Sequence, residues 1–171
     1  ALSARPQPGP TLQRRVEKAL GLRVHATSSS VAVPDLAGGP MSAVDGNLGT
    51  AWVATPDDPD PALTLTWKAR RSVDEVQVVL DGYVAATRPT HLRITSPDGN
   101  RDADLDASGT ATFRSLDTDE MTLHFTAPGL ATSLDAYTFR QTQVGLGVSD
   151  VHIAGLTPDL AVPTEPSTRP V

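Results

Sequence analysis

The chain has 171 residues, a length that suits one domain with room for terminal extensions. Its formal net charge is −6 and no run of basic residues occurs, so neither a nucleic-acid-binding face nor an anionic-lipid anchor is expected. The absence of cysteine excludes disulfides and thiolate metal sites, and no apolar run is long enough to insert into a membrane.

Residues 1–21 are predicted to form a linker and a short helix. The first ten residues contain three prolines, as linkers often do. Thr11 is expected to cap a helix that ends at Leu20, and Gly21 stands where a C-terminal cap belongs. Either this helix binds a partner or its apolar face packs on the edge of the domain; that face comprises Leu12, Val16, Ala19 and Leu20.

From residue 22 onward, apolar residues follow the two-residue period of half-buried strands. Turn signals separate these stretches, for example Pro97 to Asn100, and no further helical pattern appears. An all-β fold is therefore predicted, an antiparallel sandwich over residues 22–156, followed by a Pro-rich tail or linker over 157–171. The expected strands cover 22–27, 63–67, 76–80, 91–94, 111–114, 121–126 and 151–154.

One loop between the first two strands carries oxygen-bearing side chains on a glycine-rich backbone. Residues 43–52 read AVDGNLGTAW, with Asp45 and Thr50 on the loop and Trp52 directly after it. Carboxylate, hydroxyl and inward-turned carbonyl oxygens are the shell that Ca²⁺ prefers. The same residue types also make ordinary turns, so a cation loop and a plain turn both remain open.

The order of these features resembles discoidin-like domains, also called coagulation-factor type C domains and family 32 carbohydrate-binding modules. Residues 44–52 are similar to the "DG…T.W" signature of that family, and residues 145–155, GLGVSDVHIAG, are similar to its closing "G.g.sE..v.G" motif. The resemblance implies a jelly-roll β-sandwich of the galactose-binding-like superfamily. In this family the two motifs meet and often hold one structural Ca²⁺.

Carried over by position, the resemblance implies a calcium shell of side chains and carbonyls from both motifs. Asp150 stands where the family usually has Glu, so its carboxylate reaches one methylene less. Similar stretches occur in the extracytoplasmic part of actinobacterial cell-wall arabinofuranosyltransferases, large membrane enzymes that build arabinan. The implied metal ligands are Ala43, Asp45, Asn47, Thr50 and Asp150.

No catalytic constellation is apparent, so the chain is not expected to be an enzyme in its own right. There is no Gly-x-Ser-x-Gly elbow, and no histidine pair has zinc-ligand spacing. The acids at 57–60 and 102–106 are expected to lie in solvated loops. The histidines fall on outward strand positions and are expected at the surface: His25, His91, His124 and His152.

Sugar binding needs an exposed aromatic ring and a few polar side chains, for which loops at one end of a sandwich are the natural place. The segment 81–89 offers Tyr83 and Arg88. A second segment, 134–140, offers Asp135, Tyr137 and Arg140. Trp52 and Trp67 are instead expected in the core because both lie on apolar phases.

These observations predict a non-catalytic carbohydrate-binding domain of a larger, extracytoplasmic enzyme. Its expected partner is a cell-wall glycan such as arabinan or arabinogalactan, held near a catalytic domain elsewhere in the parent protein. Two alternatives stay open. One is a scaffold domain without a ligand, which the low aromatic content of 4 % favours. The other is a protein-interaction module that uses the N-terminal helix or a sheet edge.

Overall fold

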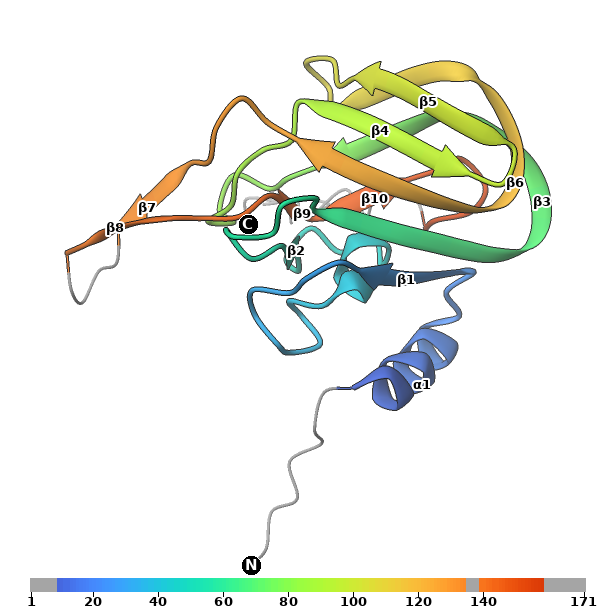
Figure 1. The fold of residues 1–171 in the computed structure, drawn as a ribbon. Helices are drawn as coiled ribbons and strands as arrows, with labels where there is room; N and C mark the ends of the chain where they lie inside the picture. The colour runs from blue at the N-terminus through green and yellow to red at the C-terminus, as the bar shows by residue number, and fades with distance from the viewer. Residues whose placement is uncertain (1–8, 135–138, 159–171) are drawn as a thin grey trace, which may run out of the picture.

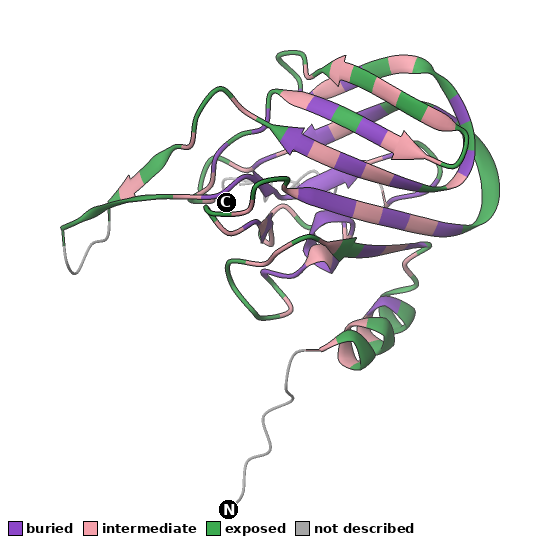
Figure 2. Cartoon of the chain, in the orientation of Figure 1, coloured by how far each residue is buried: buried purple, intermediate pink, exposed green. Residues whose placement is uncertain are grey.

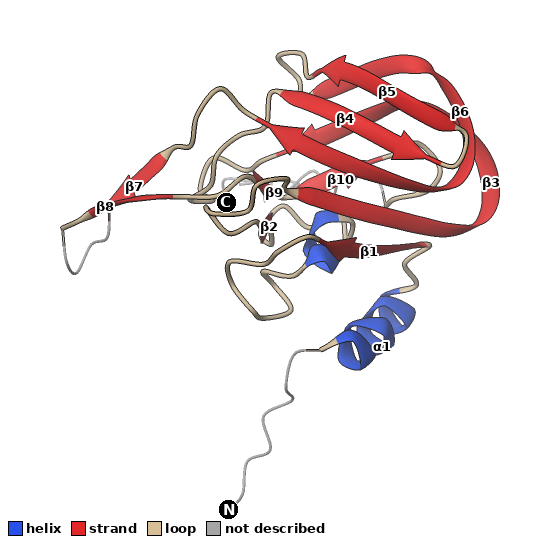
Figure 3. Ribbon diagram, in the orientation of Figure 1, coloured by secondary structure: helices blue, strands red, loops and turns tan. Residues whose placement is uncertain are grey.

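The computed structural model describes residues 9–134 and 139–158. Antiparallel strands make up most of the fold, with one short helix before them (Figures 1 and 3), as predicted. The elements are α1 (Pro10–Leu20), β1 (Val24–Ser28), the 3₁₀ helix η1 (Pro40–Ala43), β2 (Trp52–Val53), β3 (Ala62–Val79), β4 (His91–Ser96), β5 (Gly99–Asp104), β6 (Thr110–Thr126), β7 (Thr132–Leu134), β8 (Gln141–Gln143), β9 (Gly147–Val148) and β10 (Asp150–His152).

The main sheet has the strand order β1-β3-β6-β4-β5, and β10 pairs with β3 outside this path. β3 and β6 bend together at one edge of the molecule and return in a second layer (Figure 1). The first half of β3 pairs with β1 and the end of β6, whereas its second half pairs with β10 and the start of β6. One bent strand pair therefore belongs to both layers of the sandwich.

This bend corrects the predicted strand boundaries. The predicted strands 63–67 and 76–80 are the two halves of β3, and 111–114 and 121–126 are parts of β6. The pairing register shifts between Thr66 and Arg71 and again between Val73 and Glu75. Such bulges bend a strand without ending it, so the polar residues at the bend look like a loop in the sequence.

β5 was not predicted as a strand. Asp102 and Asp104 lie on it rather than in a solvated loop, and the turn predicted at 97–100 is confirmed as a two-residue turn at 97 and 98. β5 lies at the sheet edge and none of its residues is buried. Its sequence, GNRDAD, therefore lacks the alternating apolar residues that identify half-buried strands.

The helix ends as predicted but packs differently. Gly21 forms the C-terminal cap with φ of 67°, whereas Gly9, not Thr11, precedes the first turn. The expected apolar packing face is only partly covered: Leu12 and Val16 are half-buried and Leu20 is 59 % exposed, while Glu17 is the buried residue of α1. Glu17 accepts a hydrogen bond from the His25 imidazole at 2.8 Å. The side-chain amide of Gln13 donates to the carbonyl oxygen of Ala26 in β1, also at 2.8 Å. Polar contacts thus hold the helix on β1.

Buried residues lie on strands of both layers (Figure 2), and they form one hydrophobic core cluster. Trp52 is fully buried and Trp67 is 8 % exposed, so both expected core tryptophans are confirmed. The rings of Trp52 and Phe125 lie 5.7 Å apart at an angle of 46°, a tilted aromatic pair. The fully buried aliphatic side chains include Leu63, Leu65, Leu92, Ile94, Leu116 and Leu123.

Candidate functional site

The two motifs at the ends of the domain meet in space. Strand β2, directly after the glycine-rich loop, pairs with β9 of the closing motif, with Trp52 opposite Val148. The backbone N–H of Gly46 donates to Oδ1 of Asp150 at 3.2 Å, across 104 residues of chain. Gly145 permits the close approach of the closing motif to the chain after β2, because a Cβ there would lie 1.9 Å from the carbonyl oxygen of Ala54.

Oxygen atoms gather at this junction, which we call the Asp45–Asp150 junction. The Thr50 hydroxyl lies 3.0 and 3.2 Å from the two carboxylate oxygens of Asp45 and 2.9 Å from the carbonyl oxygen of Asn47. A hydroxyl has one proton to donate, so three acceptors around it are more than it can satisfy. The backbone N–H of Asn47 also donates to Oδ1 of Asp45 at 2.8 Å, yet the acceptor sites of the two carboxylates still outnumber the donors that reach them.

The pKa shifts of the two carboxylates at the junction also indicate that positive charge is lacking there. Burial raises the pKa of Asp150 to about 6, and the nearby charge of Asp45 adds to this rise. Burial also raises the pKa of Asp45, against hydrogen bonds from Asn47 and Thr50. Oδ2 of Asp150 is buried and has no hydrogen-bond partner among the described residues. A cation would supply the missing positive charge and the missing partner for this oxygen.

The residues present therefore fit a hard cation, with oxygen ligands that come mostly from neutral groups. Ala43, which the resemblance implies as a carbonyl ligand, is buried at the end of η1, two residues before Asp45. No cluster of three or more His, Asp or Glu side chains suited to a metal occurs in the described part of the chain. The junction has two carboxylates, which agrees with a calcium-like rather than a zinc-like set.

The predicted ligand loop 81–89 is ordered by its own backbone. Asp81 caps a turn, since its carboxylate accepts from the N–H of Tyr83 at 2.8 Å and its carbonyl from the N–H of Val84 at 3.1 Å. The Tyr83 side chain is fully exposed. Arg88 donates from Nη2 to the carbonyl oxygen of Leu80 at 2.7 Å, which holds its side chain back against the end of β3.

Thr87 joins this loop to the base of the β7–β8 hairpin, a connection that sequence reasoning missed. It is buried, donates from Oγ1 to the carbonyl of Val144 at 2.6 Å, and accepts at Oγ1 from the N–H of Ala131 at 2.8 Å. Its backbone bonds to Gly145 and Gly147. A single threonine in a loop carries no distinctive sequence signal, although a buried polar side chain is informative once the fold is known.

The described ends of the second predicted ligand segment, 134 and 139–140, flank or lie on the β7–β8 hairpin, whose strands project from the body of the domain (Figure 1). Arg140 is exposed, and two apolar neighbours, Leu134 and Phe139, are 58 % and 77 % exposed. Asp135 and Tyr137 lie outside the described residues. Since the arms of the hairpin begin at the Thr87 contacts, the structure places the bases of the two predicted ligand segments side by side.

Residues 144–150 connect these loops to the Asp45–Asp150 junction. Ser149 is buried, and its Oγ accepts from the backbone N–H of Asp81 at 3.0 Å, at the start of the ligand loop. The next residue, Asp150, accepts from Gly46 in the junction. Any group that fixes Asp150 therefore also fixes the segment on which loop 81–89 rests.

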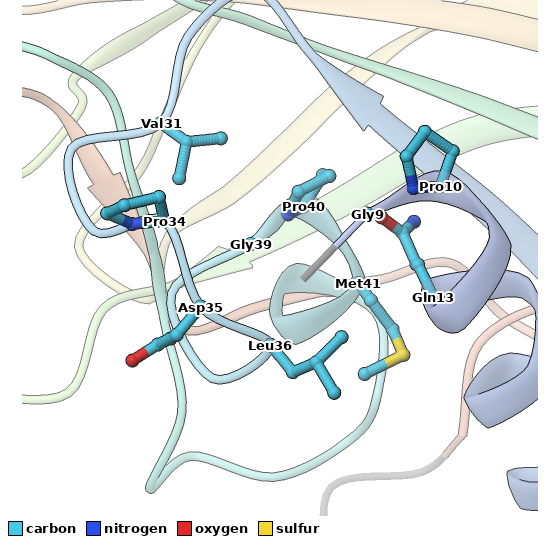
Figure 4. A pocket seen from close by; sticks show the side chains of 10 residues that line it. All are labelled: Gly9, Pro10, Gln13, Val31, Pro34, Asp35, Leu36, Gly39, Pro40 and Met41. Atoms are coloured by element: carbon cyan, nitrogen blue, oxygen red, sulfur yellow. The ribbon is translucent and has the colours of Figure 1, made fainter. Parts of the chain in front are cut away.

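Two other hollows on the surface suit other chemistry. One, of about 450 Å³, lies between the first turn of α1 and the loop before η1 (Figure 4). Its lining is largely apolar and has no aromatic ring, so it lacks the stacking surface of a sugar site. Its side chains include Pro10, Val31, Pro34, Leu36, Pro40 and Met41.

The other hollow, of about 500 Å³, lies on the outer face of β4, β5 and β6. His91 and Asp104 lie 2.8 Å apart and His124 and Asp60 lie 2.9 Å apart, so two of the histidines predicted as plain surface residues are paired with acids. The Asp104 hydrogen bond raises the pKa of His91. Arg93 also reaches Asp60 at 3.2 Å, and the polar groups here largely satisfy one another.

Residues 22–165 match the family model described as "Arabinofuranosyltransferase D, third carbohydrate binding module". The chain belongs to this family. It is thus a carbohydrate-binding module, a non-catalytic domain type of a larger enzyme, and the sequence-based expectation of no enzyme activity of its own is confirmed on this ground. No curated protein matches the chain.

Solved structures support the fold of the module. Arabinofuranosyltransferase AftD from mycobacteria shares 21 % identity with a TM-score of 0.72, and the match covers 91 % of the present chain but only 12 % of that one. Chitosan-binding module 1 of a chitosanase/glucanase from Paenibacillus sp. IK-5 shares 18 % identity, with a TM-score of 0.56 and coverage of 80 % and 98 %.

A family 32 module of NanJ from C. perfringens, solved with galactose, shares 15 % identity, with a TM-score of 0.55 and coverage of 77 % and 93 %. These likenesses confirm the predicted jelly-roll sandwich fold. The helix in the described part of the chain is too short to cross a membrane.

Proposed function

We propose that this module binds a cell-wall glycan of the arabinan or arabinogalactan type and holds it near the catalytic part of an arabinofuranosyltransferase outside the cytoplasm. Tyr83 would stack on a sugar ring, and polar side chains at the hairpin would hydrogen-bond to hydroxyl groups. One shallow site of this kind binds weakly, so neighbouring domains of the parent protein would add avidity.

The joined base of the two loops is the observation that supports this proposal most strongly. Thr87 fixes loop 81–89, which carries the fully exposed Tyr83, against the base of both hairpin arms. A preformed loop loses little conformational freedom when it binds. Arg88, also predicted as a ligand residue, has donors beyond the one that it gives to Leu80.

A structural Ca²⁺ at the Asp45–Asp150 junction is part of the same proposal. The ligands would be the carboxylates of Asp45 and Asp150, the Thr50 hydroxyl, and the carbonyls of Ala43 and Asn47. The ion would neutralise two adjacent carboxylates and tie together segments that are far apart in the chain. Because Ser149 carries the start of loop 81–89, the ion would also steady the glycan loop.

Calorimetric titration with arabinan and galactan fragments, in buffer with calcium, tests the proposal. We expect saturable heat with the wild-type chain and about tenfold weaker binding for Tyr83→Ala, since the variant loses an aromatic stacking contact. Leu20→Ala is the matched control, because Leu20 is an exposed apolar residue on α1. No heat with any cell-wall glycan at millimolar concentration would contradict the proposal.

A second candidate function, a protein-interaction module, has support from the apolar hollow beside α1 (Figure 4). The hollow presents mainly proline, valine, leucine and methionine side chains, with Gln13 and Asp35 as its polar ones. Pull-down of other domains of the parent protein with the chain, with and without residues 1–21, separates the two functions. Retention that depends on residues 1–21, with no glycan binding, would favour this second candidate.

A further inference from the structure

A third hollow, of about 260 Å³, lies where β1 begins and β3 bends, and it shares no residue with the glycan loops or the Asp45–Asp150 junction. The antiparallel register places Val24 opposite Trp67, so the residues before β1 lie beside the start of the bend. We call this hollow the Trp67 pocket. Its apolar lining comprises Leu22, Trp67 and Leu156, and its basic lining comprises Arg23, Lys68 and Arg71.

Three positive charges converge on the Trp67 pocket without a negative partner. No carboxylate in residues 9–134 and 139–158 lies within ion-pair distance of Arg23, Lys68 or Arg71. The neighbouring Arg70, by contrast, is paired with Asp117. The whole chain carries a net charge of −6, so the positive charge of this pocket is opposite in sign to that of the chain as a whole.

Trp67 supplies a second, independent observation. Its indole Nε1–H is buried and has no hydrogen-bond acceptor among the described residues. The other tryptophan is different, because Nε1 of Trp52 donates to the carbonyl oxygen of Ser30 at 2.8 Å. Buried donors without an acceptor are rare and costly, so Trp67, which lines the pocket, carries an unsatisfied donor within the wall.

We propose that the Trp67 pocket binds a phosphate group. A phosphate brings several acceptor oxygens and up to two negative charges, which matches three cations better than a single carboxylate does. Two arginines offer forked donors and the lysine offers a compact charge, beside the wall that Trp67 forms. The leucines provide apolar contact for whatever carries the phosphate, so a lipid headgroup and a free phosphate share the required chemistry.

This inference does not rest on glycan binding, and NMR separates the two. We expect inorganic phosphate to shift the indole Nε1–H resonance of Trp67 and to leave that of Trp52 in place, since Trp52 is already paired. Trp67→Phe assigns the resonance. A titration in which neither indole shifts, or both shift alike, would overturn the proposal.

Charge-neutral variants test the cations. Arg71→Gln should weaken phosphate binding by about tenfold, as expected for the loss of a charge-assisted hydrogen bond. Arg114→Gln, which removes an exposed arginine of β6 outside this pocket, should change nothing. Equal affinity in wild type and Arg71→Gln would also overturn the proposal, and unchanged resonances elsewhere would show that the variant is folded.

Vesicles then identify the carrier of the phosphate. The chain is sedimented with phosphatidylcholine vesicles with and without phosphatidic acid, whose headgroup is a phosphate monoester. Co-sedimentation that requires phosphatidic acid and is lost in Arg71→Gln identifies a lipid headgroup as the source. Binding of inorganic phosphate without co-sedimentation identifies a free phosphate, and failure of both probes contradicts the inference.

Discussion

The Asp45–Asp150 junction and the Trp67 pocket contain the two buried side-chain polar atoms that lack a partner in the described part of the chain, and the two atoms are of opposite kinds. Oδ2 of Asp150 is an acceptor among other acceptors, whereas Nε1 of Trp67 is a donor among cations. The first surrounding lacks a positive charge and the second lacks a negative one. An unsatisfied acceptor beside negative groups thus indicates a missing cation, and an unsatisfied donor beside positive groups indicates a missing anion.

The two regions also differ in how tightly the backbone confines them. Gly145, next to the junction, abuts the backbone of Ala54, whereas Gly155, next to the pocket, faces the flexible end of Arg71. We expect Gly145→Ala to cost about 3 kcal/mol or more in the free energy of unfolding, since two backbones would overlap. Gly155→Ala should cost about 1–2 kcal/mol, because its φ of 72° disfavours a side chain.

Chemical denaturation of both glycine variants measures this contrast. Gly82→Ala is the control, since no heavy atom lies within 4 Å of the added Cβ. Equal costs at positions 145 and 155 would show that the junction is not the more closely confined region.

Calcium should act on the junction alone. A hundredfold excess over the dissociation constant should add about 2.7 kcal/mol to the free energy of unfolding, and the melting temperature should rise by roughly 5–10 °C. Asp150→Asn should abolish this rise, since the variant loses the buried carboxylate that the ion would neutralise. Thermal unfolding with and without calcium measures it, and Asp106→Asn, in an exposed turn, is the control.

Without calcium, the buried carboxylate of Asp150 should destabilise the folded state when it is ionised. Burial raises the folded-state pKa of Asp150 to about 6 from 3.8, so the folded state holds its proton more tightly than the unfolded chain. The free energy of unfolding should therefore fall by roughly 2–3 kcal/mol as the pH rises between these two values. Asp150→Asn should remove that fall, and an unchanged pH profile in the variant would rule out this residue as its cause.

The two tryptophans distinguish a satisfied donor from an unsatisfied one. In phosphate-free buffer, Trp52→Phe should cost about 1–2 kcal/mol more than Trp67→Phe, because only Trp52 loses a hydrogen bond and leaves a carbonyl unpaired. Denaturant unfolding of both variants measures the difference. A larger cost at Trp67 would mean that its N–H is satisfied in solution.

The smallest effect is expected on the outer sheet face, outside both regions. A hydrogen bond with Asp104 raises the pKa of His91 above 6.5 in the folded state. The stabilisation of the folded state by this pair is therefore complete below pH 6.5 and is lost as the pH rises through the folded-state pKa of His91. Because Asp104 is 91 % exposed, the gain should stay below about 1 kcal/mol. Melting temperatures of His91→Gln at low and high pH test this, with His152→Gln as the control.

The sequence was sufficient for the regions where one pattern controls the structure. Alternating apolar residues predicted the strands, and the two motifs predicted that Asp45 and Asp150 would meet, which the Gly46 contact confirms. It was insufficient where tertiary pairing decides. The bulged bend of β3 looks like a loop, and the edge strand β5 has no buried face. The Trp67 pocket combines residues from three segments whose charges look like ordinary exposed strand positions.

NMR mapping of an arabinan fragment on the calcium-loaded chain tests the central claim most directly. If the glycan binds where we propose, the shifted amides should cluster in residues 82–88 and at the hairpin base around Ala131 and Val144, while the Trp67 pocket remains unchanged. Shifts confined to the outer face of β4–β6, or no shifts at saturating glycan, would contradict the account.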